Sequence, residues 1–351
     1  MADGQQSSAR RVIVIGPGAT GGAIAAELHL HGVPVVVVAR GAELDALRTK
    51  GLIYHITSGS TSVPLEVVGG PDELELVESD VLVVTTKTQD VEPVLREWAW
   101  APVRTADGST SSVGQSIPLI TVQNGLNTER VALRWFRTVI AGTIFCPGGK
   151  EKVGEIINYG PTLRLLLWLG HYSSGARDQE LETIAGTLGR APTLGIQPVD
   201  EILPIKAWKL AYNTRNGVEP VFAPSALRDE LEARARAEAE VVLRAEGIEP
   251  RDPLSGGLSP WSHDVLEGGV VSGHPRLGNS TLQSFVRGAP LETDYLNGEI
   301  VLLGRLHGIP TPLSEGLQIL TAQAVADNRE AGALGDEAIR RLLDRAEAQV
   351  S

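Results

Sequence analysis

The sequence predicts an α/β domain with a parallel sheet, followed by a domain built only of helices. In residues 10–199, short runs of valine and isoleucine alternate with segments typical of helices, as expected when helices connect parallel strands. In residues 200–351 only helical patterns remain. We therefore place the boundary between the two predicted domains near Val199.

The first part of the α/β domain carries the most informative motif. Val12 to Ile15 is typical of a buried parallel strand, and it is followed by Gly16-Pro17-Gly18-Ala19-Thr20-Gly21, which fits G-x-G-x-x-G. A stretch of good helix formers follows and ends at Gly32, and Val35 to Val38 supplies a second strand. Because the glycine motif lies between a strand and a helix, it predicts a dinucleotide-binding unit of the Rossmann type.

The glycine motif has a physical reason at each position. Gly16 allows the tight turn, Gly18 lets the backbone approach a pyrophosphate, and Gly21 lets the helix pack closely on the strand. The free N–H groups of the first helical turn then face the anion. We predict that the cofactor is bound by Gly16, Pro17, Gly18, Ala19, Thr20 and Gly21. The alternative is a glycine turn that binds no ligand.

The end of the second strand favours NADP(H). An acidic residue about 20 residues after the glycine motif would hold the ribose 2′-hydroxyl of NAD, whereas an arginine suits the 2′-phosphate of NADP. This chain has Arg40 there and no carboxylate before Glu43. A guanidinium forks onto phosphate oxygens, which a carboxylate would repel. The alternative is that Arg40 is a solvated arginine at a strand end.

Composition restricts the class of protein. With 42 % hydrophobic residues the chain is an ordinary globular protein, and its net charge of −12 disfavours nonspecific binding to nucleic acid or to an anionic membrane. Cys146 is the only cysteine, so an intrachain disulfide is impossible, and we interpret it as a buried, inert thiol. The seven histidines show no metal-ligand spacing, so no metal site is expected. The N-terminus resembles no signal peptide and no apolar run could span a membrane, so a cytoplasmic protein is expected.

Two further strand ends of the first domain carry polar residues. In open α/β sheets, ligands bind at the carboxyl ends of the strands. Residues 80–87 form a predicted strand ending in Lys87, which could approach the cofactor or be a solvated lysine. Residues 117–122 form another, ending in Gln123-Asn124-Gly125; here Asn124 could reach the nicotinamide, or the Asn-Gly pair could simply make a turn.

The other elements of the first domain are assigned from pattern alone. We expect helices at residues 43–50, 89–98 and 178–188, and strands at residues 52–57, 63–68, 138–145, 154–159, 163–169 and 193–198. The last strands are expected to complete the sheet, with an antiparallel strand at its edge. Residues 100–116, which are rich in small and polar residues, are predicted to form a surface loop.

The second domain is predicted to consist of helices, and the first of them carries a candidate proton donor. The helices are expected at residues 201–216, 226–245, 259–267, 291–307, 314–327 and 336–349. Lys209 and Asn213 are four residues apart, so a helix presents both on one face. Partial desolvation beside aromatic residues would lower the pKa of the Lys209 amine and make it a usable acid. Alternatively, Lys209 extends along a half-buried helix with its amine in water.

Two later polar segments are also candidates. Ser280 lies at a polar helix start, and Glu292 enters the first turn of the next helix. By pattern alone, Ser280 could be only an N-cap, and Glu292 could only complement a helix dipole.

The whole chain resembles the ketopantoate reductases (2-dehydropantoate 2-reductases). The matching motifs follow the family's order: Gly16-x-Gly18-x-x-Gly21, Arg40, Lys87, Gln123-Asn124-Gly125, Trp208-Lys209-Leu210-x-x-Asn213, Ser280-x-Leu282-Gln283, Glu292-x-Asp294-x-Leu296-Asn297-Gly298 and Gly308-Ile309-Pro310-Thr311-Pro312. The resemblance implies a Rossmann-type domain that binds NADP(H), followed by an all-α domain like the C-terminal domain of 6-phosphogluconate dehydrogenase. It also implies NADPH-dependent reduction of an α-keto acid on the pathway to pantothenate. Family members are monomers or dimers, so a homodimer is one state that the resemblance allows.

The resemblance implies a role for each candidate residue. Lys209 would be the general acid that protonates the keto oxygen, and Glu292 would hold that lysine and the substrate hydroxyl. Asn213 and Ser280 would bind the substrate. Asn124 would lie between the nicotinamide and the substrate.

The chain departs from the family at a few positions. A second asparagine is common eight residues after the lysine, but here that position is Gly217, with Asn216 one place earlier. Arg215 lies close to the helix face that would meet substrate. A reductase of another ketone or of an imine, from secondary metabolism, therefore remains an alternative. A non-catalytic NADP sensor is a third hypothesis, against which the presence of Lys209, Ser280 and Glu292 argues.

Overall fold

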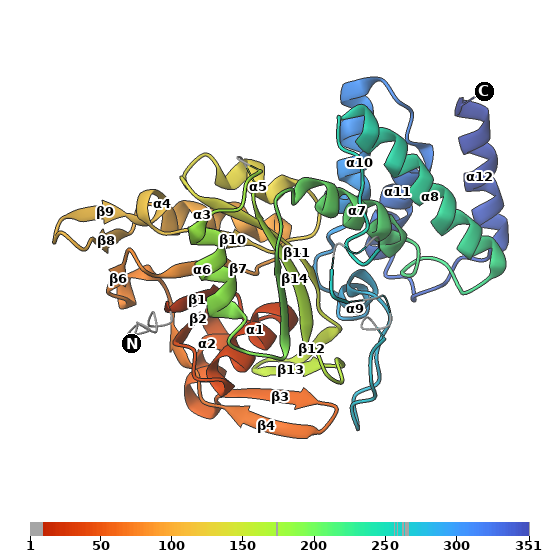
Figure 1. Ribbon diagram of the computed structural model, residues 1–351. Helices are drawn as coiled ribbons and strands as arrows, with labels where there is room; N and C mark the ends of the chain where they lie inside the picture. The colour runs from red at the N-terminus through yellow and green to blue at the C-terminus, as the bar shows by residue number, and fades with distance from the viewer. Residues whose placement is uncertain are drawn as a thin grey trace.

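The computed structural model describes residues 10–172, 175–255, 257, 259–261, 263 and 267–350. One half of the molecule contains the β-sheets, and it lies beside a second half made of helices (Figure 1). The predicted fold class, an α/β domain followed by an all-α domain, is confirmed. The position of the boundary near Val199 remains a prediction, although the last strand ends at Pro198 and the next helix begins at Leu203.

The main sheet has eight strands in the order β15-β14-β11-β10-β7-β1-β2-β5. All neighbouring pairs are parallel except β11 with β14, so the expected antiparallel pairing near the edge is confirmed. The strands are β1 (Val12–Ile15), β2 (Val35–Val38), β5 (Glu66–Val68), β7 (Val81–Val84), β10 (Leu119–Thr121), β11 (Val139–Phe145), β14 (Leu165–His171) and β15 (Leu194–Pro198). The carboxyl ends of β1, β7 and β10 therefore meet at one edge.

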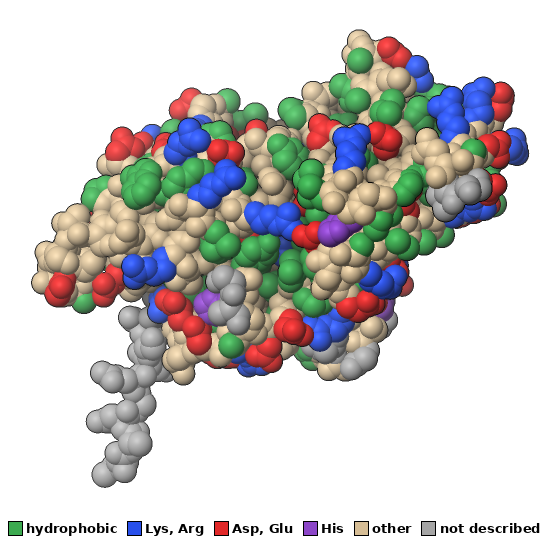
Figure 2. Space-filling model, turned by 90° about the horizontal axis from the view of Figure 1, so that it is seen from above, with side chains coloured by type: hydrophobic (Ala, Val, Ile, Leu, Met, Phe, Trp, Pro, Cys, Tyr) green, Lys and Arg blue, Asp and Glu red, His purple; other side chains and the backbone are tan. Residues whose placement is uncertain are grey.

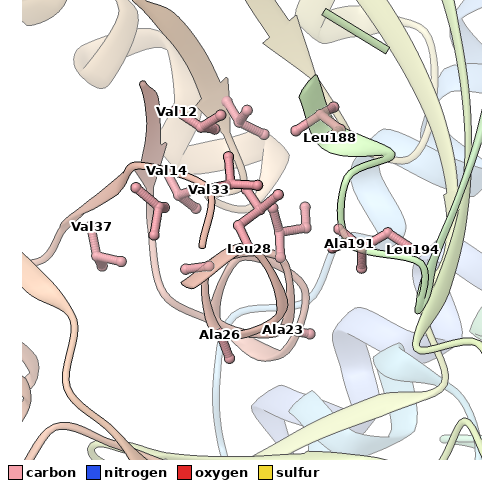
Figure 3. Packing of buried hydrophobic residues seen from close by; sticks show 14 of the residues in the cluster. Val12, Val14, Ala23, Ala26, Leu28, Val33, Val37, Leu188, Ala191 and Leu194 are labelled. Carbon is pink, nitrogen blue, oxygen red and sulfur yellow. The ribbon is translucent and has the colours of Figure 1, made fainter. Parts of the chain in front are cut away.

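Helix α1 (Ala19–Leu30) fixes the glycine motif against this sheet. Alanines and glycines leave little side-chain volume, so the helix approaches the sheet closely, and eight of its residues are buried. Figure 3 shows Ala23, Ala26 and Leu28 of α1 among side chains from β1, β2 and the segment that precedes β15. Other helices of this half are α2 (Gly41–Lys50), α3 (Val91–Ala99), α4 (Val113–Ser116), α5 (Asn127–Ala132) and α6 (Gln179–Leu188).

The helical half packs against the sheet half through helix α7. It contains α7 (Leu203–Asn213), the 3₁₀ turn η3 (Thr214–Gly217), α8 (Ala226–Ala245), α9 (Ser280–Val286), α10 (Thr293–His307), α11 (Pro312–Ala326) and α12 (Asp336–Val350). Apolar side chains of α7, α8 and α10 form one core, which also includes Leu126 from the sheet half. Since this core crosses between the halves, it fixes α7 against the sheet.

Two segments differ clearly from the sequence predictions, and a third lies partly outside the described residues. Residues 100–116 are not a structureless loop, because β8 (Pro102–Arg104) and β9 (Thr110–Ser112) form a hairpin beside β6 (Leu76–Val77). The strand predicted at residues 154–159 does not join the main sheet but pairs in a second sheet, of order β12-β13-β3-β4. The strands of this sheet are β12 (Gly148–Lys152), β13 (Glu155–Asn158), β3 (Leu52–Ile56) and β4 (Gly59–Val63). The helix expected at residues 259–267 falls partly on residues outside the described part of the chain.

The surface carries charges of both signs. On the face drawn in Figure 2, Lys and Arg side chains are interspersed with Asp and Glu side chains outside the grey atoms. Within the described residues, no helix is long and apolar enough to cross a membrane.

Candidate active site

A cavity of about 430 Å³ lies where the carboxyl ends of the central strands meet the helical half. Its sheet side includes Gly18, Lys87 and Asn124, which follow β1, β7 and β10 respectively. Its helical side comes from α7, η3 and α9, and includes Lys209, Asn213 and Ser280. The fold therefore brings together the three predicted substrate-binding residues, the predicted acid and part of the glycine motif.

The geometry of the glycine motif suits an anionic cofactor. Gly16 has φ +96°, and a Cβ at Gly21 would lie only 2.2 Å from Thr85 Oγ1, so both positions require glycine. Gly18 borders open space, with no atom within 4 Å of an added Cβ. It is also the N-cap residue of α1, and no side chain caps that helix. The N–H groups of the first turn, which include those of Ala19 and Thr20, thus point to a site where an anion fits.

Arg40 lies outside the cavity, at the N-terminus of α2 just beyond β2. Its side chain is 59 % exposed, and the guanidinium forms an ion pair with Glu97 of α3. Arg40 is thus placed at the strand end where a 2′-phosphate would lie, but binding a phosphate there requires Arg40 to exchange its carboxylate partner.

Lys87 connects the two halves of the molecule. Its Nζ donates to Ser284 Oγ at 2.9 Å and to the Pro290 carbonyl at 2.5 Å. Burial lowers the pKa of this amine, while the nearby Glu292 carboxylate raises it. The Lys87 side chain therefore lies on the cavity wall, but its amine is engaged by the helical half.

Asn124 is held where β10 ends. The side-chain amide of the preceding Gln123 donates to the carbonyls of Val84 and Thr86, at 3.0 and 2.9 Å, which fixes this turn to β7. The Asn124 Oδ1 atom is buried and has no hydrogen-bond partner among the described residues. A buried, unpaired amide oxygen on a cavity wall is available to a ligand that donates a hydrogen bond.

Lys209 is half-buried on the cavity wall. Its Nζ contacts the Ile144 carbonyl and lies 4.5 Å from the centre of the Phe145 ring. Burial, together with the positive charge of Lys206, lowers the pKa of Lys209 to about 7, although the Glu292 carboxylate opposes the shift. The alternative in which the Lys209 amine extends into water is therefore wrong. An amine with a pKa near neutrality can both hold and release a proton at working pH.

The N-cap alternative for Ser280 fails on geometry, whereas Glu292 is the N-cap residue of α10, where its charge also complements the helix dipole. The N-cap of α9 is Asn279, whose Oδ1 accepts from the Leu282 N–H at 2.9 Å, so Ser280 is free to face the cavity. The Glu292 side chain makes no capping hydrogen bond to α10. Its carboxylate accepts from the backbone N–H and the hydroxyl of Thr88, at 3.3 and 3.2 Å. Glu292 thus reaches across the cavity to the sheet half.

Comparison with known proteins agrees with this arrangement. Residues 12–171 match the family model described as ketopantoate reductase PanE/ApbA, and residues 206–325 match the model of its C-terminal domain. The chain belongs to the ketopantoate reductase family. It is therefore an oxidoreductase that acts on a CH–OH/C=O pair.

Individual relatives cover nearly the whole chain. It is 26 % identical to 2-dehydropantoate 2-reductase of Archaeoglobus fulgidus, over 88 % of this chain and 95 % of that protein. The corresponding protein of Caulobacter vibrioides is 29 % identical, over 86 % and 94 %. Among solved structures, the ketopantoate reductase from Ralstonia eutropha JMP134 aligns with a TM-score of 0.72 at 20 % identity, covering 90 % of this chain and 99 % of that one. D-mandelate dehydrogenase with NADH and anilino(oxo)acetate aligns with a TM-score of 0.73 at 19 % identity, with the same coverage.

This member of the ketopantoate reductase family lacks the second asparagine at position 217, but Asn216 lines the cavity. After Asn213 the chain changes from α-helix to the 3₁₀ turn η3, so Asn216, three residues on, lies on the same face and lines the cavity. A Cβ at Gly217 would lie 2.9 Å from Asn297 Oδ1, so this position is restricted by packing. Asn216 therefore reaches the cavity wall in place of a residue at position 217.

Sequence reasoning missed the buried ion pair behind the cavity. Lys206 Nζ lies 3.0 Å from Glu129 Oε1 and also donates to the carbonyls of Gln123 and Gly142. Both side chains are at most 2 % exposed. The available signal was a lysine and a glutamate within otherwise apolar patterns, since such residues are rarely buried unless paired. The interpretation of Cys146 as a buried thiol is wrong in one respect, because the side chain is only partly buried and lines the cavity. Desolvation nevertheless raises the pKa of the Cys146 thiol to about 12, which keeps it protonated at neutral pH.

Proposed function

We propose that this protein reduces an α-keto acid to a 2-hydroxy acid with NADPH, with ketopantoate as the first candidate substrate. The observation that carries the proposal is the Lys209 amine, with its pKa lowered to about 7, in a cavity that also holds the glycine turn and Asn124. A binding protein without chemistry has no need of a proton donor at that place. The names of the curated relatives support the same reaction.

The reaction follows from the placement of the side chains. The glycine motif of residues 16–21 would hold a nicotinamide cofactor, which in its reduced form would supply the hydride for the carbonyl carbon. Lys209 Nζ donates a proton to the carbonyl oxygen as negative charge develops there. Glu292 favours the protonated form of that lysine at rest, since its charge raises the Lys209 pKa. Asn213 and Ser280 hold the carboxylate or hydroxyl of the substrate, and Asn124 positions the substrate against the cofactor.

The choice of NADPH over NADH rests on Arg40. The guanidinium stands at the end of β2, where the 2′-phosphate of NADP binds in Rossmann folds. Its present partner Glu97 is on the surface, and exposed ion pairs are weak, so a phosphate can replace that carboxylate at little cost. We expect Arg40→Gln to raise the KM for NADPH and to leave that for NADH unchanged.

A spectrophotometric assay tests this proposal directly. Oxidation of NADPH and of NADH is followed with ketopantoate, with other 2-oxo acids, and with neutral ketones and imines. We expect turnover of a 2-oxo acid with preference for NADPH. Preference for a neutral ketone or an imine would instead favour the secondary-metabolism alternative. Cofactor binding without turnover of any compound would favour a sensor.

A further inference from the structure

One arginine on the cavity wall has no role in the mechanism above. Arg215 belongs to η3, between Asn213 and Asn216, and all three residues line the cavity. Its guanidinium carbon lies 4.2 Å from the centre of the Tyr212 ring. Its Nε is buried and has no hydrogen-bond partner among the described residues. A buried guanidinium N–H without an acceptor is costly, unless a ligand supplies one.

Lys150 and Arg287, two other cations of the cavity lining, are already engaged. Lys150 forms an ion pair with Glu43 at 2.7 Å, and Arg287 donates to the Lys150 carbonyl at 2.5 Å. The Glu232 carboxylate interacts electrostatically with Arg215. Its ion pair, however, is with Arg228, at 3.5 Å from that guanidinium. Arg215 thus differs from these cations, because its charge meets the cavity without a close carboxylate in the described part of the chain.

The aromatic residues of α7 hold Arg215 in place. The Tyr212 ring stacks on that of Trp208, with centroids 5.4 Å apart and an angle of 11° between the planes. A guanidinium stacked on a fixed ring loses little further freedom when it binds an anion, and its planar fork matches the two oxygens of a carboxylate. The Arg215 guanidinium is therefore preorganised for a carboxylate.

We propose that Arg215 binds the carboxylate of the substrate and makes the enzyme selective for 2-oxo acids over neutral ketones. The inference rests on the proposed function, since it concerns the same cavity and the same reaction. Lys209 and Arg215 lie on consecutive turns of one continuous segment, with Asn213 between them. The lysine meets the reacting carbonyl, and the arginine meets the carboxylate beside it. Arg215 is thus a specificity-determining residue, whereas Lys209 is catalytic.

The test compares a 2-oxo acid with its own methyl ester, which keeps the carbonyl and removes the charge. In Arg215→Gln we expect the KM for the acid to rise roughly 10- to 100-fold, the usual range for loss of a charge-assisted pair, with kcat changed little. The KM for the ester should stay near the wild-type value. Arg215→Lys keeps the charge but loses the fork, so it should recover only part of the affinity for the acid.

Arg236→Gln is the matched control. Arg236 lies 5.5 Å from the Trp208 ring, at the other end of the same aromatic stack, and pairs with Glu240 on α8. It does not belong to the cavity lining found among the described residues. An unchanged KM for the acid in Arg215→Gln, or an equal rise for acid and ester, would overturn the role of Arg215. Absence of turnover by the wild-type protein with every 2-oxo acid would contradict the proposed function itself, and this role with it.

Discussion

Two lysines on helix α7 have contrasting surroundings, although their positions are only three apart. Lys206 lies behind the cavity and is 3 % exposed, and its amine reaches the Glu129 carboxylate and two backbone carbonyls within 3.3 Å. Lys209 lies on the cavity wall, and its amine contacts the Ile144 carbonyl and the Phe145 ring. One region contains a closely paired amine, and the other contains an amine that is desolvated, with no carboxylate within ion-pair distance among the described residues.

The difference shows how one helix can supply both a structural and a reactive amine. The Lys206 amine is held between the Glu129 carboxylate and the carbonyl of Gln123, the residue before Asn124, so its role is structural. Burial without such pairing lowers the pKa of Lys209 to about 7. The Lys206 charge contributes to this shift, so the structural lysine also tunes the reactive one.

The largest effect is expected from removing the reactive amine. Lys209→Met should lower kcat roughly 10²- to 10⁴-fold, the usual contribution of a positioned general acid. The thermal unfolding midpoint and the Kd for NADPH should stay near the wild-type values, since the substitution removes a desolvated charge. Steady-state kinetics and cofactor titration measure these quantities. Turnover that survives in this variant would remove Lys209 from the mechanism.

Replacing the structural lysine, Lys206, should mainly lower the stability of the protein. Lys206→Met leaves the Glu129 carboxylate buried without its partner, so we expect a loss of about 3–5 kcal/mol in the free energy of unfolding. Chemical denaturation measures the loss. The double variant Lys206→Met/Glu129→Leu removes both charges and should recover much of it. If the single variant were as stable as the wild type, the contrast between the two lysines would not hold.

Much of the fold could be predicted from the sequence because its signals are local. The strand, glycine turn and helix at residues 12–30 lie within one short segment, and the buried strands of the main sheet are continuous apolar runs. The hairpin of β8 and β9 was missed because only Val103 of its strand residues is buried, so apolar alternation is absent. The Asp107-Gly108 pair, with φ +79° at the glycine, was the turn signal that could have revealed it.

The site was predictable to the extent that spacing along one element determines it. Lys209 and Asn213 share a helix face, as their spacing predicts. Asn216 counted as a departure because it stands one place before the family's second asparagine, and the change to a 3₁₀ turn that brings it to the cavity was not predicted. Contacts between distant segments were not predictable, because no local pattern encodes them. Two examples are the ion pair between Arg40 and Glu97 and the hydrogen bond from Thr88 to Glu292.

The pH dependence of activity should follow the pKa of Lys209. Lys209 donates a proton only when it is charged, so kcat/KM for reduction should be constant below its pKa of about 7 and fall about tenfold per pH unit above it. The reverse oxidation needs the neutral amine, and its rate should rise over the same range. Rate profiles in both directions measure the break, and a break near the ordinary lysine pKa of about 10.4 would contradict the desolvated environment of Lys209.

The smallest expected effect concerns the position of that break. Glu292 raises the Lys209 pKa, so Glu292→Gln should move the break to lower pH, by about one unit or less because the two groups act through space. Asp294→Asn is the matched control: it lies on the first turn of α10 and binds Gln318 at 2.7 Å, away from the cavity lining found in the described part of the chain. The control should leave the break in place. A shift of equal size in both variants would mean that the overall charge of the protein, and not the Glu292 carboxylate, sets the charge state of Lys209.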